Sequence, residues 1–277
     1  MKTYHFKDLK FVVGALCIGV IILMALVGGL LSPHDPVNQD LLSSQLPPGS
    51  EGHIFGTDHL GRDIFARMIS GARISVVVAA TVVVLSGVFG VLVGALSGFW
   101  GGWRDIVIQK FVETIWAFPA ILLALAILAF FGQSLVNLIL ALSIQRWIPY
   151  CRIARAHALV IRNREYVAAS RVLGGGTAWI VRQHILPNLV SSSIVIATFS
   201  MATAILSEAS LSFLGLGVPP HIPTWGGMLA EGRSYVTGAW WIAVFPGLAI
   251  FLTVLGLNLL GDWCRDLLDP KKSLNLR

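Results

Sequence analysis

Histidine and aspartate side chains gather in one polar stretch of the N-terminal third, where metal binding is the first chemistry to consider. His34, His53 and His59 occur there with Asp35 and Asp58. Successive histidines lie 19 and 6 residues apart, and the common metal-ligand patterns do not have these spacings. We therefore expect solvated loop histidines and no metal site.

The sequence also lacks the patterns of the common catalytic sites. The cysteines Cys17, Cys151 and Cys264 have neither disulfide-type nor zinc-type spacing. The chain contains no Gly-x-x-x-x-Gly-Lys-Ser/Thr phosphate loop, no His-Glu-x-x-His and no Gly-x-Ser-x-Gly. We predict no catalytic residue, no cofactor and no ATP site, so an intramembrane enzyme is the least favoured class.

Two ionisable residues lie within or at the end of long apolar runs, where a charge is costly and usually faces the protein interior or water. Arg146 either lines a translocation path that favours carboxylate-bearing solutes, or snorkels to an interface near Trp147 and Tyr150. We favour snorkelling, because aromatic anchors cluster there. Glu208 is expected to pack against a partner or to line an outer vestibule of the path.

The apolar runs dominate the composition. Of 277 residues, 56% are hydrophobic and 12% are charged, whereas a soluble domain carries about 25% charged residues. A soluble core of this chain length cannot absorb so much apolar surface. The net charge of +6 is spread between the runs, which favours membrane topology over nucleic-acid binding. The composition predicts an all-α polytopic membrane protein in contact with lipid.

Six runs reach the length of about 20 residues that a membrane-spanning helix needs. They cover residues 11–31, 74–99, 107–131, 134–153, 189–208 and 239–260. The first is too long for a signal peptide and lacks a cleavage site, so we expect a retained helix. In the second, Gly90, Gly94 and Gly98 share one face, which indicates close helix packing more than a gating hinge. Pro119 can kink the third.

The basic residues orient these helices. With a cytoplasmic N-terminus, only Arg62, Arg67, Arg73 and Arg233 of the 20 lysines and arginines lie outside, which is the bias that the positive-inside rule expects. Both termini are then cytoplasmic, and so is the basic segment 154–188.

This basic segment contains the clearest signal for an interaction. Three glycines, Gly174 to Gly176, follow a short helical pattern, and Pro187 can begin the next span. A short helix with small side chains and an exposed glycine is suited to docking on another protein. The alternative is a basic loop that only fixes topology. The residues that recur at helical spacing are Tyr166, Val167, Ala169, Ser170 and Leu173.

The segment resembles the coupling loop of binding-protein-dependent ABC importer permeases, which reads Glu-Ala-Ala, three residues, Gly, nine residues, Ile-x-Leu-Pro. Gly174, Leu186 and Pro187 match that pattern, whereas Ala168 and His184 replace its Glu and Ile. The resemblance implies contact with an ATPase through Glu165, Tyr166, Ala168, Ala169, Arg171, Gly174, Leu186 and Pro187.

Three further segments are similar to the dipeptide, oligopeptide and nickel importer permeases, specifically to the second of their two membrane subunits. The first reads Gly-Thr-Asp-His-Leu-Gly-Arg-Asp at residues 56–63. The second reads Glu-Ala-Ser-Leu-Ser-Phe-Leu-Gly-Leu-Gly at 208–217, followed by Trp-Gly-Gly-Met-Leu at 225–229. The third runs from Phe-Pro-Gly-Leu at 245 to Asp-Pro at 270. With the coupling loop, the resemblance covers residues 10–272.

The resemblance implies a type I ABC importer permease fold with six transmembrane helices and a cytoplasmic coupling helix. Residues 1–73 would form the N-terminal tail, the first helix and an outer segment. Residues 74–272 would form the core permease domain with its coupling loop 154–188, and 273–277 the C-terminal tail. The chain would form half of a path for short peptides, or for nickel or another metal chelate.

The partners implied are a homologous second permease subunit, two ATPase subunits and an extracytoplasmic solute-binding protein, in the inner membrane of a bacterium. The competing class is a self-contained secondary transporter or channel, which should carry proton-relay carboxylates mid-membrane. Glu113 and Glu208 both lie near span ends, and the chain shows no two-halves repeat. We therefore favour the partner-dependent importer subunit.

Overall fold

The computed structural model describes residues 2–50 and 52–268, apart from the side chains of residues 2–8 and 31. The regular elements of this part of the chain are helices, joined by loops that contain two isolated β-bridges. The helices are α1 (Lys2–Leu31), α2 (Ile64–Trp100), α3 (Gly102–Trp116), α4 (Ala120–Phe131), α5 (Leu135–Ile161), α6 (Glu165–Val172), α7 (Thr177–Ile180), α8 (Leu186–Phe213), α9 (Trp225–Gly232) and α10 (Trp241–Leu268). Short turns are η1 (Leu41–Ser43), the π-helical η2 (Val181–Ile185) and η3 (Arg233–Tyr235).

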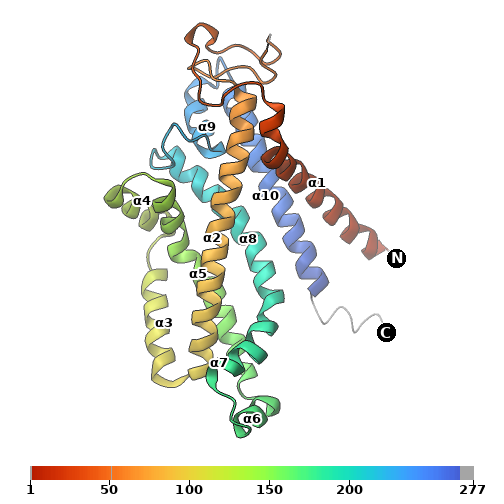
Figure 1. Cartoon of the computed structure of the whole chain (residues 1–277), viewed down its shortest axis with the longest axis vertical. Coiled ribbons are helices and arrows are strands. Elements are labelled where there is room, and N and C mark those ends of the chain that lie inside the picture. The colour runs from red at the N-terminus through yellow and green to blue at the C-terminus, as the bar shows by residue number, and fades with distance from the viewer. Residues whose placement is uncertain (1, 51, 269–277) are drawn as a thin grey trace.

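The long helices α2, α5, α8 and α10 form an elongated bundle, with α1 on the side of α10 (Figure 1). Four helical stretches are long and apolar enough to cross a membrane: Leu9–Leu30, α2, Thr177–Phe213 and α10. The pair α3 and α4 makes a fifth if the two count as one bent span. The basic helix α5 is not among them. The chain is thus an all-α polytopic membrane protein with four to five candidate spans, where the sequence predicted six.

Several helices extend beyond the predicted spans. Helix α2 begins at Ile64 rather than at residue 74, because the Asp63 carboxylate caps it and accepts a hydrogen bond of 2.7 Å from the Ala66 amide. Helix α5 continues to Ile161 and α8 to Phe213. Capping, and not the end of the apolar run, therefore sets where these helices end.

The third predicted span is broken and not merely kinked. Helix α3 ends at Trp116, Pro119 stands at the start of α4, and the two helices meet at 83°. Proline lacks the amide hydrogen of a helix interior and disfavours a helical residue before it, so the chain turns there. Helix α4 consequently leans away from the bundle (Figure 1).

The glycine face of α2 lies directly on α5. A β-carbon at Gly90, Gly94 or Gly98 would lie between 2.1 and 2.5 Å from a backbone oxygen of α5. Small residues allow such approach in lipid, where van der Waals packing holds helices together. These three glycines therefore pack helix against helix.

A buried ion-pair network closes the end of the bundle that carries α9. Arg62 and Arg67 each contact both Asp58 and Glu231, and Arg62 lies 2.6 Å from the first and 2.7 Å from the second. Burial would raise the pKa of the Asp58 carboxyl, but the guanidiniums of Arg67 and Arg62 outweigh it and hold that pKa below its usual value. Because Glu231 belongs to α9, the network joins α9 to the start of α2.

The expectation of solvated loop histidines is wrong for His53 and His59. The loop before α2 folds back on itself, with the Gln45 amide bonded to the Asp58 carbonyl at 2.9 Å. His53 is largely buried, and its Nδ1 lies 2.7 Å from Asp63 Oδ2. His59 stacks on Tyr235 with 5.1 Å between ring centroids. The loop is a compact cap whose histidines pack against other parts of the chain.

The glycine contact yields a stability prediction with a control on the same helix. Gly94→Ala would place a β-carbon 2.1 Å from the Cys151 carbonyl oxygen, whereas Gly87→Ala would place one 3.5 Å from the Tyr150 ring. Overpacking of this kind costs about 1–3 kcal/mol. We expect Gly94→Ala to lower the thermal unfolding midpoint of the detergent-solubilised chain, and Gly87→Ala to leave it unchanged or raised. Equal midpoints for the two variants would contradict this packing.

Candidate functional site

The segment between α5 and α8 forms the end of the molecule opposite α9 (Figure 1). Helix α6 is anchored there by Val167, which is fully buried in an apolar cluster with Ile180 and Ile185. The side chains on its other faces are exposed: Glu165, Tyr166, Ala168, Ala169 and Arg171. One buried residue thus holds a short helix whose predicted contact residues face outward.

A glycine turn ends α6 and exposes two large apolar side chains. Gly174 has a φ of +85°. Its amide donates to the Arg171 carbonyl at 3.0 Å, and the next amide donates to the Ser170 carbonyl at 2.9 Å. These two bonds form a Schellman cap, whose left-handed residue is glycine because glycine has no β-carbon to clash. The turn leaves Val172 88% and Leu173 87% exposed. Together with Tyr166, they form the loop tip.

His184 fixes the loop tip to the start of α8. Its Nε2 lies 3.1 Å from the Ser170 hydroxyl, and its ring contacts the rings of Tyr166 and Trp179 at centroid distances of 5.2 and 5.4 Å. His184 lies in the π-helical turn η2, a conformation often found at functional sites. The polar replacement of the expected isoleucine thus bonds directly to α6.

Two predicted contact residues lie elsewhere. Leu186 packs against the apolar cluster beneath α6, and Pro187 is exposed in the first turn of α8. The eight residues that the resemblance grouped together therefore divide into six on α6 and its glycine turn and two at the base of α8.

Arginines join this end of the molecule to the bundle, a role that charge counting alone could not assign. Arg155 forms two hydrogen bonds to the Asp105 carboxylate, at 2.7 and 2.6 Å. Arg162 donates to the Gly98 carbonyl at 3.0 Å, and Arg171 lies 4.9 Å over the ring of Phe99. A paired guanidinium and carboxylate is among the strongest polar contacts in proteins. Asp105, which the sequence analysis passed over, is thus part of the support of the loop.

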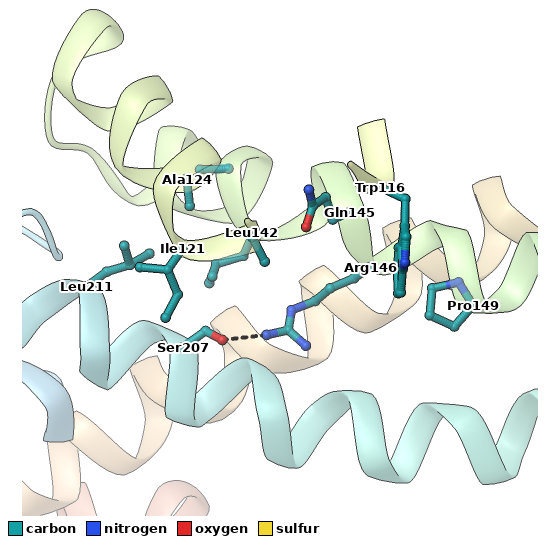
Figure 2. Close-up of a pocket in the computed structure, with 11 residues that line it drawn as sticks. Trp116, Ile121, Ala124, Leu142, Gln145, Arg146, Pro149, Ser207 and Leu211 are labelled. Carbon is teal, nitrogen blue, oxygen red and sulfur yellow. Dashed lines mark hydrogen bonds between the residues drawn. The ribbon is translucent and has the colours of Figure 1, made fainter. Parts of the chain in front are cut away.

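A cavity of about 210 Å³ opens between α4, α5 and α8, and Arg146 reaches into it (Figure 2). The guanidinium lies against α8, where it bonds the Thr203 hydroxyl at 2.7 Å, the Thr203 carbonyl at 2.9 Å and the Ser207 hydroxyl at 2.7 Å. The snorkelling orientation that we favoured from the sequence is therefore wrong. Thr203 and Ser207, one turn apart on α8, accept hydrogen bonds from the two terminal nitrogens of the guanidinium inside the bundle.

The walls of this cavity suit an amphipathic solute. Trp116, Ile121, Leu142 and Leu211 line it with apolar groups. The Nε of Arg146 is buried and has no hydrogen-bond partner among the described residues. A guanidinium presents donors in a planar fork that matches a carboxylate. Both terminal nitrogens of this guanidinium are bonded to α8, so a carboxylate could pair with it only after these contacts open.

Glu208 does not line this cavity. The side chain is 2% exposed, and its Oε1 accepts hydrogen bonds from the Ser212 hydroxyl at 2.9 Å and the Thr224 hydroxyl at 2.8 Å. A β-carbon at Gly226 would lie 2.8 Å from the carboxylate. Neither sequence interpretation of Glu208 holds, because the residue joins α8 to the start of α9 inside this chain.

Comparison with known families places most of the chain in one group. Residues 90–274 match the family described as "Binding-protein-dependent transport system inner membrane component". Residues 7–48 match the "N-terminal TM domain of oligopeptide transport permease C".

Curated relatives match along nearly the whole chain. The di/tripeptide transport system permease protein DppC of Pseudomonas aeruginosa (strain UCBPP-PA14) is 43% identical over 263 residues, which cover 93% of this chain and 87% of DppC. The probable D,D-dipeptide transport system permease protein DdpC of Escherichia coli (strain K12) is 42% identical over 260 residues, with coverages of 94% and 87%. The oligopeptide transport system permease protein OppC of Bacillus subtilis (strain 168) is 41% identical over 259 residues, with coverages of 94% and 85%.

A solved structure shares the fold. It is a chain of the MetNI methionine ABC transporter in inward-facing conformations, and it superposes with a TM-score of 0.58 at 18% identity. The match covers 73% of this chain and 97% of the other. At this identity the likeness concerns the arrangement of the helices alone.

The glycine turn gives a prediction that tests the need for a left-handed backbone at Gly174 separately from the need for space around it. Neither Gly174 nor Gly176 has an atom within 4 Å of an added β-carbon, but only Gly174 has a positive φ, since Gly176 is at −73°. We expect Gly174→Ala to cost about 1 kcal/mol locally and to speed hydrogen exchange across residues 165–176 by roughly fivefold. Gly176→Ala should leave the protection of this segment unchanged. Similar protection in both variants would exclude the Schellman cap.

Proposed function

The chain belongs to the family of binding-protein-dependent transport system inner membrane components, and from this premise we propose that it forms half of a translocation path for short peptides. It is an inner-membrane permease subunit of an ABC transporter and not the ATPase, and membership implies ATPase and binding-protein partners. The peptide assignment rests on three relatives that are 41–43% identical over more than nine-tenths of the chain. They are named for the transport of dipeptides, tripeptides and oligopeptides.

We place six spans in the membrane: α1, α2, the bent pair α3 and α4, α5, the stretch from α7 to α8, and α10. Helix α5 has 27 residues, enough for about 40 Å at 1.5 Å per residue. The glycine contact keeps it beside α2, and Arg146 is satisfied by α8, so its charge does not face lipid. The loop tip and both termini are then cytoplasmic, while the cap before α2 and helix α9 are extracytoplasmic.

The loop tip is the surface that an ATPase subunit would contact. The apolar side chains of Val172 and Leu173 support this proposal, because they are almost fully exposed and follow a helix that is anchored in the apolar cluster. Exposed apolar side chains that are rimmed by polar ones mark protein contacts. A homologous second permease subunit with its own loop tip would contact the second ATPase and complete the path.

Movement of the loop tip would reach the cavity through one continuous element. Helices α7 and α8, with the π-helical turn between them, form one helical stretch over Thr177–Phe213. Helix α6 is bonded to this element through His184, and the same element carries Thr203 and Ser207, which hold Arg146. A tilt of α8 on closure of the ATPases would separate these hydroxyls from the guanidinium. The freed guanidinium would then bind the carboxylate of a peptide.

The loop-tip assignment predicts a loss of ATPase attachment. Leu173→Asp would bury an unpaired charge in the proposed contact, and loss of a hot-spot residue from an interface costs about 2 kcal/mol or more. We expect at least about a tenfold drop in the ATPase that co-purifies with the membrane complex, with unchanged amounts of inserted permease. Leu42→Asp is the matched control, since Leu42 lies in η1 of the cap before α2 and is 98% exposed. Full ATPase recovery with Leu173→Asp would remove the loop tip from the contact.

The cavity assignment predicts a change in solute preference. Arg146→Gln removes the guanidinium, and a hydrogen bond to a charged group contributes about 1.5–3 kcal/mol. In proteoliposomes with saturating binding protein, uptake of peptides with a free C-terminal carboxylate should fall by roughly tenfold or more. Uptake of their C-terminal amides should change little.

Arg152→Gln serves as the control, because Arg152 is an exposed cation on the same helix and does not line the cavity. It should leave both uptake rates unchanged. Equal losses for the two kinds of peptide with Arg146→Gln would exclude a role for Arg146 in carboxylate binding.

A further inference from the structure

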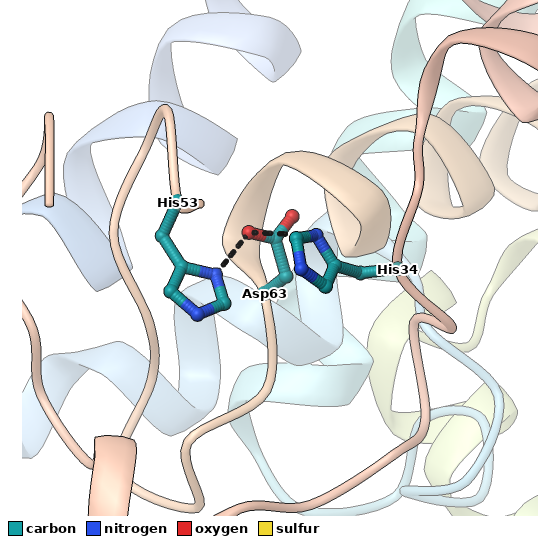
Figure 3. Close-up of side chains that lie close together, drawn as sticks. All are labelled: His34, His53 and Asp63. Carbon is teal, nitrogen blue, oxygen red and sulfur yellow. Dashed lines mark hydrogen bonds and ion pairs between the residues drawn. The ribbon is translucent and has the colours of Figure 1, made fainter. Parts of the chain in front are cut away.

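Two histidines and an aspartate from separate segments converge in the cap before α2 (Figure 3). His53 Nδ1 lies 2.7 Å from Asp63 Oδ2, and His34 Nδ1 lies 3.9 Å from the same oxygen. The two imidazole rings are stacked, with centroids 4.8 Å apart. His34 follows α1, His53 lies in a tight turn of the cap, and Asp63 begins α2.

Hydrogen bonds hold the three chain segments that carry this cluster. Asp63 Oδ1 caps α2 through the Ala66 amide, so Oδ2 faces the histidines. The His53 amide donates to the Ser50 carbonyl at 2.8 Å, and the Ser32 hydroxyl donates to the His34 carbonyl at 3.2 Å. The cluster is therefore held by the fold and does not depend on chance contact between flexible side chains.

Of the two histidines, only His53 lies within hydrogen-bonding distance of the Asp63 carboxylate. The Nδ1 of His53 can share a proton with the carboxylate, but the 3.9 Å separation of His34 is too long for a hydrogen bond. The candidate ligand atoms all lie within 4.8 Å of one another. Ligands about 2.0–2.2 Å from a tetrahedral zinc ion lie about 3.3–3.5 Å apart. The His53–Asp63 distance is shorter than that spacing and the His34–Asp63 distance is longer, so both rings would shift when an ion enters.

Charge distinguishes this cluster from a second group of ligand-type residues in the same cap, Asp58, His59 and Glu231. There the two carboxylates already bind Arg62 and Arg67, so a metal cation would compete with two guanidiniums. Among the described residues, the ion-pair partners of Asp63 are the two histidines alone. Its carboxylate is 4% exposed, and a buried carboxylate favours a positive partner.

We propose that His34, His53 and Asp63 form a binding site for one divalent transition-metal ion of the zinc class. Two imidazoles and one carboxylate are ligands that zinc accepts, and a fourth position remains for water. The ion is resident and structural, and it is not transported. It joins the segment after α1 to the start of α2 and so fixes the outer end of the first helix.

The test uses zinc itself on the full-length chain in nanodiscs, with bound metal measured by mass spectrometry after equilibrium dialysis against a buffered zinc concentration. Wild type should bind one equivalent. His34→Ala should weaken binding by about 100-fold or more, since loss of even an outer partner of a ligand costs roughly 10–100-fold. Cobalt in place of zinc should give the visible spectrum of a tetrahedral ion in wild type and not in this variant.

His221→Ala is the matched control, because His221 is an exposed histidine outside the cluster. It should retain the full equivalent of zinc. His34 is the most exposed ligand, and its variant should unfold at the wild-type temperature without metal. A wild-type chain that binds no zinc would overturn the proposal, and so would equal binding by the His34→Ala and His221→Ala variants.

Discussion

The backbone contact between α2 and α5 is the constraint on which the positions of the remaining parts depend. The three glycines of α2 bring the two helices so close that a single added carbon would meet a carbonyl oxygen. Helix α5 carries Arg146 in its middle and Arg155 nearer its end, so this contact fixes where the cavity lies and where the loop support begins. Helix α2 carries the outer cap at its start and Phe99 beside the loop at its end. One rigid pair of helices thus gives both ends of the molecule a common frame.

Against this frame, the contact of α8 with Arg146 of α5 is polar and can exchange partners, although α8 also packs into the apolar core through Ile205 and Leu211. Arg146 bonds two hydroxyls and a carbonyl on α8, and each such bond contributes only about 1–3 kcal/mol because water or a solute can replace it. A glycine-packed surface has no such substitute, since separation of α2 and α5 would leave a void. The contrast makes α8, rather than α5, the element that would move when the loop tip is displaced.

Local patterns predicted the parts of the site that depend on neighbours in sequence. The glycine turn after Leu173 follows from a left-handed residue that only glycine adopts easily, and the face of Gly90, Gly94 and Gly98 follows from helical spacing. The spacing of residues in the sequence did not predict contacts between residues that lie far apart along the chain. Arg146 was assigned to the interface because its acceptors on α8, more than 50 residues away, leave no local mark. His53 was expected in solvent because Asp63 and His34 meet it only after the cap folds back. The break at Pro119 was predicted in place but not in size, since the 83° angle depends on the packing of α4.

The two ends of α8 determine what kind of motion the fold permits. At the outer end, Glu208 is buried and accepts a hydrogen bond from Thr224, which is the N-cap of α9. Helix α9 is in turn joined to the start of α2 by the arginine network. Separating the buried arginines of this network from their carboxylates would cost several kcal/mol, so we take the outer end of α8 as its more firmly held end. At the inner end, the π-helical turn and Pro187 interrupt the regular hydrogen-bond ladder, and the exposed loop tip lies beyond them. Under the proposed contact with an ATPase, we therefore expect force at the loop tip to tilt α8 about its end near Glu208 and not to translate the whole bundle. Thr203 lies more than one turn from Glu208 on the side of the loop tip, whereas Ser207 is the neighbour of Glu208, so such a tilt would displace the Thr203 contacts of Arg146 first while the glycine-packed helices remain in place.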